Sequence, residues 1–331
     1  MSGAPVKSCL VVGAGMAGLN AARVLQASGW QVTVLDKGRG VGGRLATRRI
    51  DEGVYDHGAQ FITVRNPRFA SLIAALQQEG VVYEWCRGIG TPDQPSQNDG
   101  HPRYQGSGGM SAIAKHLARG IDVRTRHRVV QLKETPKTWT AVLESGQLIS
   151  ADALLLTTPV PQALDLLDLG GAELPDTQRK QLDGLKYHPC LALMIALDQP
   201  SLLPPPGALR FEEGPLSFVC DNRVKGISPD STALTLHASA SFSREHWSVS
   251  DSVVIEFLLN QAKPWLSGPA RTAILHRWRF SMPVDPYPEP FLRVEGHAPL
   301  VFAGDAFNAP RVEGAAISGM TAAESLLASM V

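Results

Sequence analysis

The sequence predicts an α/β protein in which a domain built on a parallel sheet is interrupted by a second domain of α+β type. At residues 8–27, a short apolar run is followed by a glycine-rich turn and a helix-forming segment. The same alternation of strand, turn and helix returns at residues 298–331, after a middle region of mixed helices, strands and proline-rich loops at 161–295. Because both ends of the chain share this alternation, we expect them to fold together into one domain.

The chain has 331 residues, which is enough for two domains. We assign residues 1–70, 105–160 and 297–331 to the parallel-sheet domain, which is therefore discontinuous. Residues 71–104 and 161–296 form the inserted domain, which we expect to be built on a mostly antiparallel sheet.

Composition and charge argue against several classes of partner. Apolar residues make up 44% of the chain, and Lys plus Arg and Asp plus Glu both number 31, so no overall field favours nucleic acid or anionic lipid. The four cysteines have no metal-ligand spacing, and no apolar run approaches the ~18 residues of a membrane span. The N-terminus lacks the layout of a signal peptide. We therefore expect a cytoplasmic protein without metal, and its oligomeric state stays open.

The elements of the parallel-sheet domain follow from local pattern. An apolar strand at 8–12, a helix at 16–27 that stops at Gly29, and a strand at 31–36 form a βαβ unit. Amphipathic helices are predicted at 67–80 and 109–120. A series of strands follows at 121–158, with a hairpin turn at 144–146 and a last apolar strand at 153–156.

The first glycine turn indicates a dinucleotide site of the Rossmann type. Residues 13–18 read GAGMAG and fit G-x-G-x-x-G between a strand and a helix. The glycines allow a tight turn, a close approach to a pyrophosphate, and packing of helix on strand, while the helix N-terminus attracts the phosphates. Asp36 ends the next strand about 20 residues on, where an acid binds a ribose hydroxyl.

A second glycine-rich turn, GRGVGGR at residues 38–44, follows Asp36 at once. Its backbone amides and Arg44 could bind a phosphate. The alternative is a surface loop with a solvated arginine.

These motifs resemble those of the flavin-containing amine oxidase superfamily, whose members bind FAD. G-x-G-x-x-G followed by an acid and R-x-G-G-R is its N-terminal signature, and the chain also carries DHGAQF at 56–61, GGM at 108–110 and FAGD at 302–305 with EGAAISG at 313–319. The resemblance implies that the second turn closes over the pyrophosphate side of FAD. It also implies that the last helix directs its N-terminus at the flavin, where it can stabilise the reduced, anionic form.

The resemblance assigns a set of residues to FAD: Gly13, Ala14, Gly15, Met16, Ala17, Gly18, Asp36, Lys37, Gly43, Arg44, His57, Gly58, Ala59, Gln60, Phe61, Val129, Thr158, Gly304, Asp305, Gly314, Ala315 and Ile317. Val129 stands where such proteins contact adenine through strand backbone. Asp305 stands near the ribityl and phosphate groups.

Within the superfamily, the chain most resembles the renalase family, through DHGAQFIT, HRWRFS and its compact length. Renalases oxidise dihydronicotinamide dinucleotides that carry the hydride at the wrong ring position, 2 or 6. They return NAD(P)⁺ and pass the electrons through FAD to oxygen, which gives hydrogen peroxide. The resemblance implies this function, with a dinucleotide and O₂ as small-molecule partners.

The alternative is a flavin amine oxidase that acts on a small amine. Many such enzymes have a lysine on the strand that enters the substrate domain, and the matching stretch at 187–194, YHPCLALM, has none. Residues 306–311, AFNAPR, offer one phenylalanine in place of an aromatic cage and no cysteine to bond the flavin. Both departures argue against amine oxidation and favour noncovalent FAD.

Oxidation of a dihydronicotinamide needs no general base, so the protein must mainly hold the ring against the flavin. We expect Trp278 to form one wall of the site, with Phe61 opposite or adjacent, or else to be a core residue. His237 and Asn222 are expected to contact the substrate, although His237 could also be a satisfied core histidine. The substrate pyrophosphate needs positive charge, and the candidates Arg279, Arg223 and Arg244 could equally be surface residues.

Overall fold

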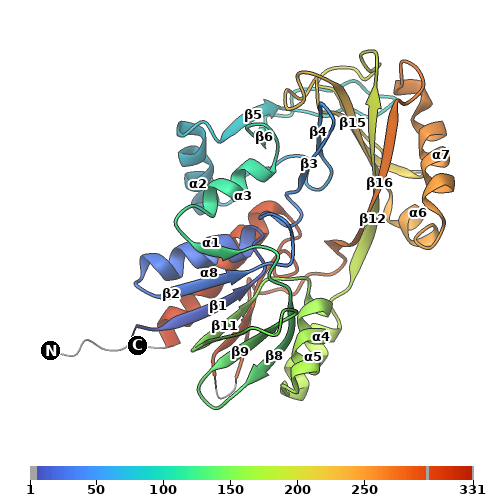
Figure 1. The fold of residues 1–331 in the computed structure, drawn as a ribbon. Coiled ribbons are helices and arrows are strands. Elements are labelled where there is room, and N and C mark those ends of the chain that lie inside the picture. Colours follow the sequence, from blue (N-terminus) through green and yellow to red (C-terminus); the bar gives the residue numbers. More distant parts are fainter. Residues whose placement is uncertain (1–5, 296–297, 330–331) are drawn as a thin grey trace.

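The computed structural model describes residues 6–295 and 298–329, so the predicted domain boundary between residues 296 and 297 lies outside the described residues. The larger sheet has six strands in the order β17, β18, β11, β1, β2, β7 (Figure 1). Their bounds are β1 (Ser8–Val12), β2 (Gln31–Leu35), β7 (Asp122–Arg124), β11 (Ala153–Leu156), β17 (Leu292–Val294) and β18 (Leu300–Phe302). All neighbouring pairs are parallel except β17 with β18. The predicted parallel sheet is confirmed, and both ends of the chain contribute to it.

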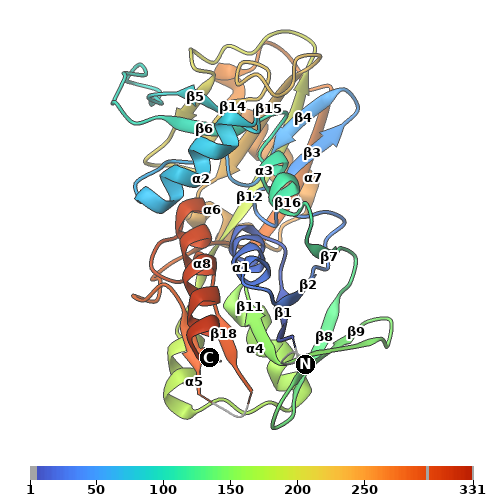
Figure 2. The same ribbon diagram turned by 90° about the vertical axis from the view of Figure 1, so that its left-hand side faces the viewer.

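Alternate residues of β1 bury their side chains on the two faces of this sheet. Cys9 and Val11 belong to a core that includes α1 (Met16–Ala27) and α8 (Val312–Ser329), and these two helices lie side by side in Figures 1 and 2. Leu10 and Val12 belong to a second core on the other face. That core takes in helices α4 (Val160–Gly170) and α5 (Asp176–Asp183) and the small sheet of β8 (Val129–Glu134), β9 (Trp139–Leu143) and β10 (Leu148–Ala151).

The second large sheet is antiparallel and has five strands in the order β13, β14, β15, β12, β16. Their bounds are β12 (Tyr187–Leu197), β13 (Ala208–Arg210), β14 (Leu216–Asp221), β15 (Thr232–Ala238) and β16 (Thr272–Pro283). Apolar side chains of this sheet share a core with α6 (Ala240–Glu245), α7 (Asp251–Ala262) and η1 (Lys263–Trp265), which cover one face. The other face turns toward the glycine-rich turns of the parallel sheet (Figure 1). The predicted antiparallel sheet is also confirmed.

Two hairpins and two helices complete the fold: β3 (Thr47–Ile50) with β4 (Gly53–Asp56), β5 (Val82–Cys86) with β6 (Arg103–Gly106), α2 (Pro67–Gln78) and α3 (Ser111–Leu117). The residue ranges that we assign to the two domains stay a prediction. Within the described residues, no helix combines the length and the apolar character that crossing a bilayer requires.

Candidate active site

Residues of both large sheets line a cavity of about 2360 Å³, which we call the central cavity. Its lining comes from the carboxyl ends of the parallel strands and from the open face of the antiparallel sheet. Sites for one small molecule usually have a volume of about 300–1,000 Å³. The central cavity therefore has room for a large cofactor and a second ligand.

Of the three glycines in the first turn, only Gly15 has open space where a Cβ atom would lie. Gly13 has φ +110° and donates its N–H to the Leu35 carbonyl at 2.8 Å. A Cβ on Gly18 would lie 2.0 Å from the Gly13 oxygen, whereas a Cβ on Gly15 would meet no atom within 4 Å. Gly15 lines the cavity. The turn thus has the free backbone that the approach of a pyrophosphate requires.

Asp36 connects the two glycine-rich turns. Its Oδ2 accepts the N–H of Ala14 at 2.7 Å, and its Oδ1 accepts the N–H of Gly38 at 2.6 Å. In addition, the Gly42 N–H donates to the Ala14 carbonyl at 2.8 Å. The second turn therefore packs directly on the first.

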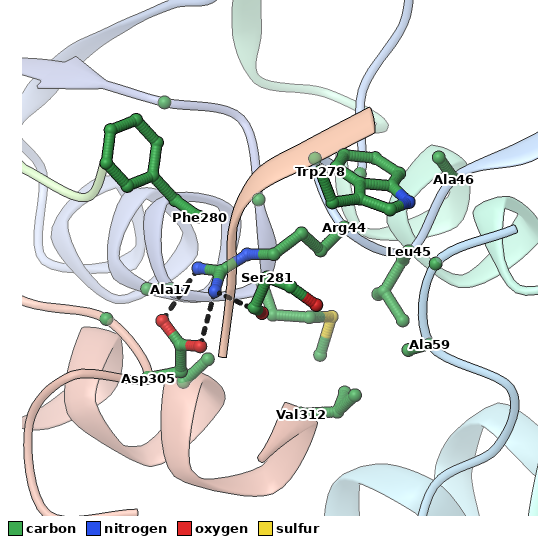
Figure 3. A pocket seen from close by; sticks show the side chains of 18 of the residues that line it. Ala17, Arg44, Leu45, Ala46, Ala59, Trp278, Phe280, Ser281, Asp305 and Val312 are labelled. Atoms are coloured by element: carbon green, nitrogen blue, oxygen red, sulfur yellow. Dashed lines mark hydrogen bonds and ion pairs between the residues drawn. The ribbon is translucent and has the colours of Figure 1, made fainter. Parts of the chain in front are cut away.

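Arg44, at the end of the second turn, forms a two-pronged ion pair with Asp305 (Figure 3). The guanidinium donates to Asp305 Oδ2 at 2.6 Å and Oδ1 at 2.7 Å, and also to the Ser281 carbonyl at 3.1 Å. Burial alone would lower the pKa of Arg44. The charge of Asp305 and its hydrogen bonds together have the larger effect, so the pKa of Arg44 is raised. The second turn thereby joins the N-terminal and C-terminal elements, and Arg44 is not a solvated surface arginine.

The N-terminus of α8 faces the same cavity. Val312, Glu313 and Ala315 line it, and the Glu313 carboxylate accepts the N–H groups of Arg65 and Asn66 at 2.7 and 2.6 Å. These bonds hold the segment that leads into α2 against the start of α8.

A row of residues in register crosses the antiparallel sheet, and we call it the cross-sheet row. From edge to edge it consists of Arg210, Phe218, His237, Ala192 and His276, each paired with the next. Residues paired in this way point to the same face of a sheet. All of them except Ala192 line the central cavity. The cross-sheet row is therefore one wall of the cavity.

Trp278 extends this wall beside His276. Its Nε1 donates to the His57 carbonyl at 2.8 Å, and its ring stacks on His57 with centroids 5.3 Å apart. His237 Nε2 lies 3.2 Å from the same carbonyl. Because a carbonyl only accepts, Nε2 of His237 carries the proton, which leaves its Nδ1 as an acceptor. Trp278 is half-buried at the cavity and is not a core residue.

The three histidines of this wall are held in the neutral form. Burial lowers the pKa of His57 to about 3 and the pKa of His237 to about 4. The pKa of His276 is lowered by burial and then by the charge of Arg48. At neutral pH, the wall therefore presents uncharged imidazoles.

A buried ion pair supports the loop at residues 57–60 from behind. Lys225 Nζ lies 2.7 Å from Asp56 Oδ2 and 2.5 Å from the Gln60 carbonyl, and both charged side chains are fully buried. Asp56 Oδ1 accepts from Thr47 Oγ1 and from the Met110 N–H. The sequence analysis missed Lys225, because it lies 169 residues from Asp56 and outside any motif.

Four buried polar atoms on residues that line the cavity have no partner among the described residues: His57 Nδ1, Gln60 Oε1, Arg103 Nε and Thr158 Oγ1. A buried polar atom that makes no hydrogen bond is costly. Together with the open backbone at Gly15, these atoms show a cavity shaped for a polar ligand, and the residues present fit an FAD.

Most of the predicted site residues line this cavity. They are Gly13, Gly15, Met16, Ala17, Asp36, Lys37, Gly43, Arg44, His57, Gly58, Ala59, Gln60, Phe61, Val129, Thr158, His237, Trp278, Gly304, Asp305 and Ala315. Their individual contacts with a cofactor or substrate stay predictions.

Five predicted residues do not line the cavity: Asn222, Ala14, Gly18, Gly314 and Ile317. Asn222 is fully buried, and its amide donates to the Ala233 carbonyl and Thr235 Oγ1 while its Oδ1 accepts the Asp56 N–H. Asn222 therefore lies behind the wall. The structure does not bring it to the cavity, where we expected it to contact the substrate. Ala14 instead binds Asp36, and Ile317 packs against the core.

Two of the three arginines expected near the substrate phosphates lie elsewhere. Arg223 and Arg244 are exposed and do not line the cavity, whereas Arg279 lines it and also lies over the Trp247 ring, 6.0 Å from its centroid. Arg48 and Arg210, which the sequence did not single out, also line the cavity. Pairing across strands decides these positions, and no short motif marks them.

The Rossmann-like sheet, and the polar cavity that an antiparallel sheet covers, fit a flavin-dependent oxidoreductase. Residues 86–327 match the family described as flavin containing amine oxidoreductase, and residues 11–76 match the NAD(P)-binding Rossmann-like domain. The chain belongs to the flavin containing amine oxidoreductase family. Membership implies FAD as the cofactor.

The chain is also similar to renalase of Mus musculus, at 25% identity over 289 residues, which cover 82% of this chain and 84% of that protein. The predicted resemblance to renalases is thereby confirmed. The fold matches a proposed protoporphyrinogen oxidase from Exiguobacterium sp. 255-15 with a TM-score of 0.76, at 16% identity over 99% of this chain and 100% of that one. It also matches putrescine oxidase bound to putrescine, with a TM-score of 0.70, at 15% identity over 98% and 100% of the two chains.

Proposed function

We propose that the protein oxidises dihydro-NAD(P) isomers that carry the hydride at ring position 2 or 6. Bound FAD would accept the hydride and pass two electrons to O₂. The balanced reaction takes one dihydro-NAD(P), one O₂ and one proton to NAD(P)⁺ and hydrogen peroxide. The glycine-rich turns, Asp36 and the N-terminus of α8 would hold the FAD.

The observation that carries this proposal is the charge of the cavity wall. The wall joins neutral His57, His237 and His276 to Trp278, with Arg48 and Arg210 beside them. Such a surface can stack and hydrogen-bond an uncharged dihydronicotinamide ring and attract its phosphates. It repels a protonated amine.

The carboxylates of the cavity support the same choice. Five of them line it: Asp36, Asp99, Asp165, Asp305 and Glu313. Four are engaged with backbone N–H groups or arginines. The fifth, Asp165, is exposed on α4, which is not part of the antiparallel sheet. No carboxylate described in the structure is therefore free at the wall to receive an ammonium group.

The chain's own residues would position the reacting ring and do not have to move a proton. Trp278 supplies an apolar face, and Nδ1 of His237 can accept an N–H of the nicotinamide carboxamide. Removing a hydride needs no base, because the lone pair of the ring nitrogen expels it. Neutral histidines at this wall are consistent with that chemistry.

An anaerobic titration of the purified holoenzyme tests the proposal. Isomerised NADH, ordinary NADH and a panel of small amines are added in turn, and the flavin absorbance is followed. We expect bleaching by the 2- and 6-dihydro isomers and not by the amines. Bleaching by amines alone would show that the protein is an amine oxidase.

Two variants separate binding from chemistry in stopped-flow measurements with the preferred isomer. His237→Ala should raise the Kd of the substrate more than it lowers the limiting rate of flavin reduction. Trp278→Ala should harm both, because loosening the wall displaces the reacting carbon. Arg244→Ala, at an exposed residue off the cavity, is the control.

A further inference from the structure

The far end of the cross-sheet row carries the positive charge of Arg210, to which the proposed function assigns no particular group of the substrate. Arg210 is the last residue of β13, the edge strand, and its backbone N–H donates to the Gly90 carbonyl at 2.9 Å. Its guanidinium lies over the Phe61 ring, 5.6 Å from the centroid. Strand pairing therefore fixes the backbone of Arg210 at the cavity, and its exposed side chain contacts an aromatic neighbour there.

Arg210 has no ion-pair partner among the described residues. The nearby Arg103 is paired with Asp99, at 2.6 Å. Burial and then the charge of Arg103 lower the pKa of Arg210, while Asp99 and Cys86 act in the opposite direction. Asp99 is thus occupied by Arg103, and Arg210 is left as a cation that faces the cavity without a counter-ion.

The distance along the row suits a dinucleotide. Arg210 lies two strands from His237, which is about 10 Å at the usual spacing of strands in a sheet. Phe218 lies between them in the row, and Phe61 packs on it with ring centroids 6.2 Å apart. A nicotinamide ring at His237 and Trp278 would place its ribose over these aromatic rings and its phosphates near Arg210.

The cofactor's own phosphates would bind at a different place. The glycine-rich turns at residues 13–18 and 38–44 follow β1 and β2 of the parallel sheet, whereas the cross-sheet row belongs to the antiparallel sheet, and both sheets contribute to the lining of the cavity. A second cation site on the antiparallel sheet is therefore suited to the second ligand.

We propose that Arg210 binds the diphosphate of the dinucleotide substrate, through the two-pronged hydrogen bonds that guanidinium groups form with phosphate oxygens. This inference rests on the proposed function. It makes Arg210 a binding residue that sets the preference for dinucleotides over smaller dihydronicotinamides.

The experiment compares two substrates in anaerobic flavin reduction by the holoenzyme: a 6-dihydro-NAD preparation, and the matching dihydronicotinamide riboside, which has no phosphate. Arg210→Met should raise the Kd of the dinucleotide about 10- to 100-fold and leave its limiting rate of reduction unchanged. The Kd of the riboside should change by less than about 2-fold. Arg210→Lys should restore part of the affinity, because charge remains while the two-pronged geometry is lost.

Arg244→Met, at an exposed arginine off the cavity, is the matched control, and FAD content checks that each variant folds. An equal effect on both substrates, or none on either, would overturn the role of Arg210 while the proposed function stands. If neither substrate reduces the wild-type flavin, it is the proposed function that fails.

Discussion

Lys225 Nζ lies 2.7 Å from Asp56 Oδ2, and neither side chain is exposed to solvent. The pair connects the segment after β14 with the end of β4, and it bonds the Gln60 carbonyl on the loop whose other face lines the cavity. A buried ion pair of this kind adds little net stability over an apolar pair, but breaking it leaves an uncompensated charge.

Lys225→Met is therefore expected to lower the free energy of unfolding by about 3–5 kcal/mol. Urea unfolding of the protein, followed by circular dichroism, measures this loss. The double variant Lys225→Met/Asp56→Asn should recover part of it, because the stranded carboxylate is gone. Lys186→Met, at an exposed lysine, is the control. A loss of the same size in the control would contradict the special role of the buried pair.

Gly15→Ala should separate cofactor binding from folding. A Cβ there meets nothing within 4 Å in the protein, so the free energy of unfolding without FAD should change by less than about 0.5 kcal/mol. FAD affinity should fall at least about tenfold, because the methyl group occupies the space of the pyrophosphate. Equilibrium dialysis with FAD measures it.

Two other glycine variants serve as controls for that experiment. Gly268→Ala, also in open space, should leave both quantities unchanged. Gly319→Ala should instead destabilise the fold by about 1–3 kcal/mol, since its Cβ would lie 2.0 Å from the Ala17 carbonyl between α1 and α8. Full FAD affinity in Gly15→Ala would place the pyrophosphate elsewhere.

Asp36→Ala should weaken FAD binding by about 1–3 kcal/mol, through lost ribose hydrogen bonds and through the loss of its bonds to Ala14 and Gly38. Retention of flavin during dialysis reports the effect. Asp165→Ala removes an exposed carboxylate from the same cavity and should leave retention unchanged. Equal retention in the two variants would argue against a ribose at Asp36.

Stability should depend on pH through the wall histidines. In the folded protein the pKa values of His57 and His237 are about 3 and 4, below the ordinary value of 6.5. The unfolded chain therefore binds more protons at mildly acidic pH. The contribution of the two neutral histidines to the free energy of unfolding is complete above about pH 6.5. It is lost as the pH falls through about 4 for His237 and about 3 for His57.

The measurement is the free energy of unfolding between pH 7 and pH 4, in wild type and in His237→Asn. We expect a smaller decrease in the variant, because one neutral buried histidine is gone. His101→Asn, at an exposed histidine, should follow the wild-type curve. An identical pH dependence in wild type and His237→Asn would contradict the neutral, buried state of His237.

The flavin should be bound without a covalent bond. Of the four cysteines only Cys190 lines the cavity, and burial raises its pKa to about 12, so it holds no thiolate at neutral pH. Acid precipitation should release the yellow colour into the supernatant. Colour that stays in the pellet would reveal a covalent bond.

Local pattern was sufficient for much of the fold. The strand, glycine turn and helix at residues 8–27 depend on apolar alternation and on backbone freedom over a few residues, and β11 (Ala153–Leu156) has the bounds that its apolar run predicts. Most of the proposed cofactor residues line the cavity. They belong to short motifs, and a short motif fixes the local backbone geometry of its residues.

Contacts between residues that are distant in the chain determine which side chains form the wall of the substrate site. Asn222 follows a strand and is polar, yet pairing between β14 and β15 turns its side chain inward to Thr235. Arg210 has no motif around it, and it reaches the cavity because β13 pairs in register with β14. The sequence by itself determined the strands and the glycine turns, because these depend on residues that are close in the chain, and its motifs indicated the class of cofactor through the family resemblance. Only the tertiary structure decided which charged and aromatic side chains meet at the cavity, because strand register and burial bring them together from separate segments.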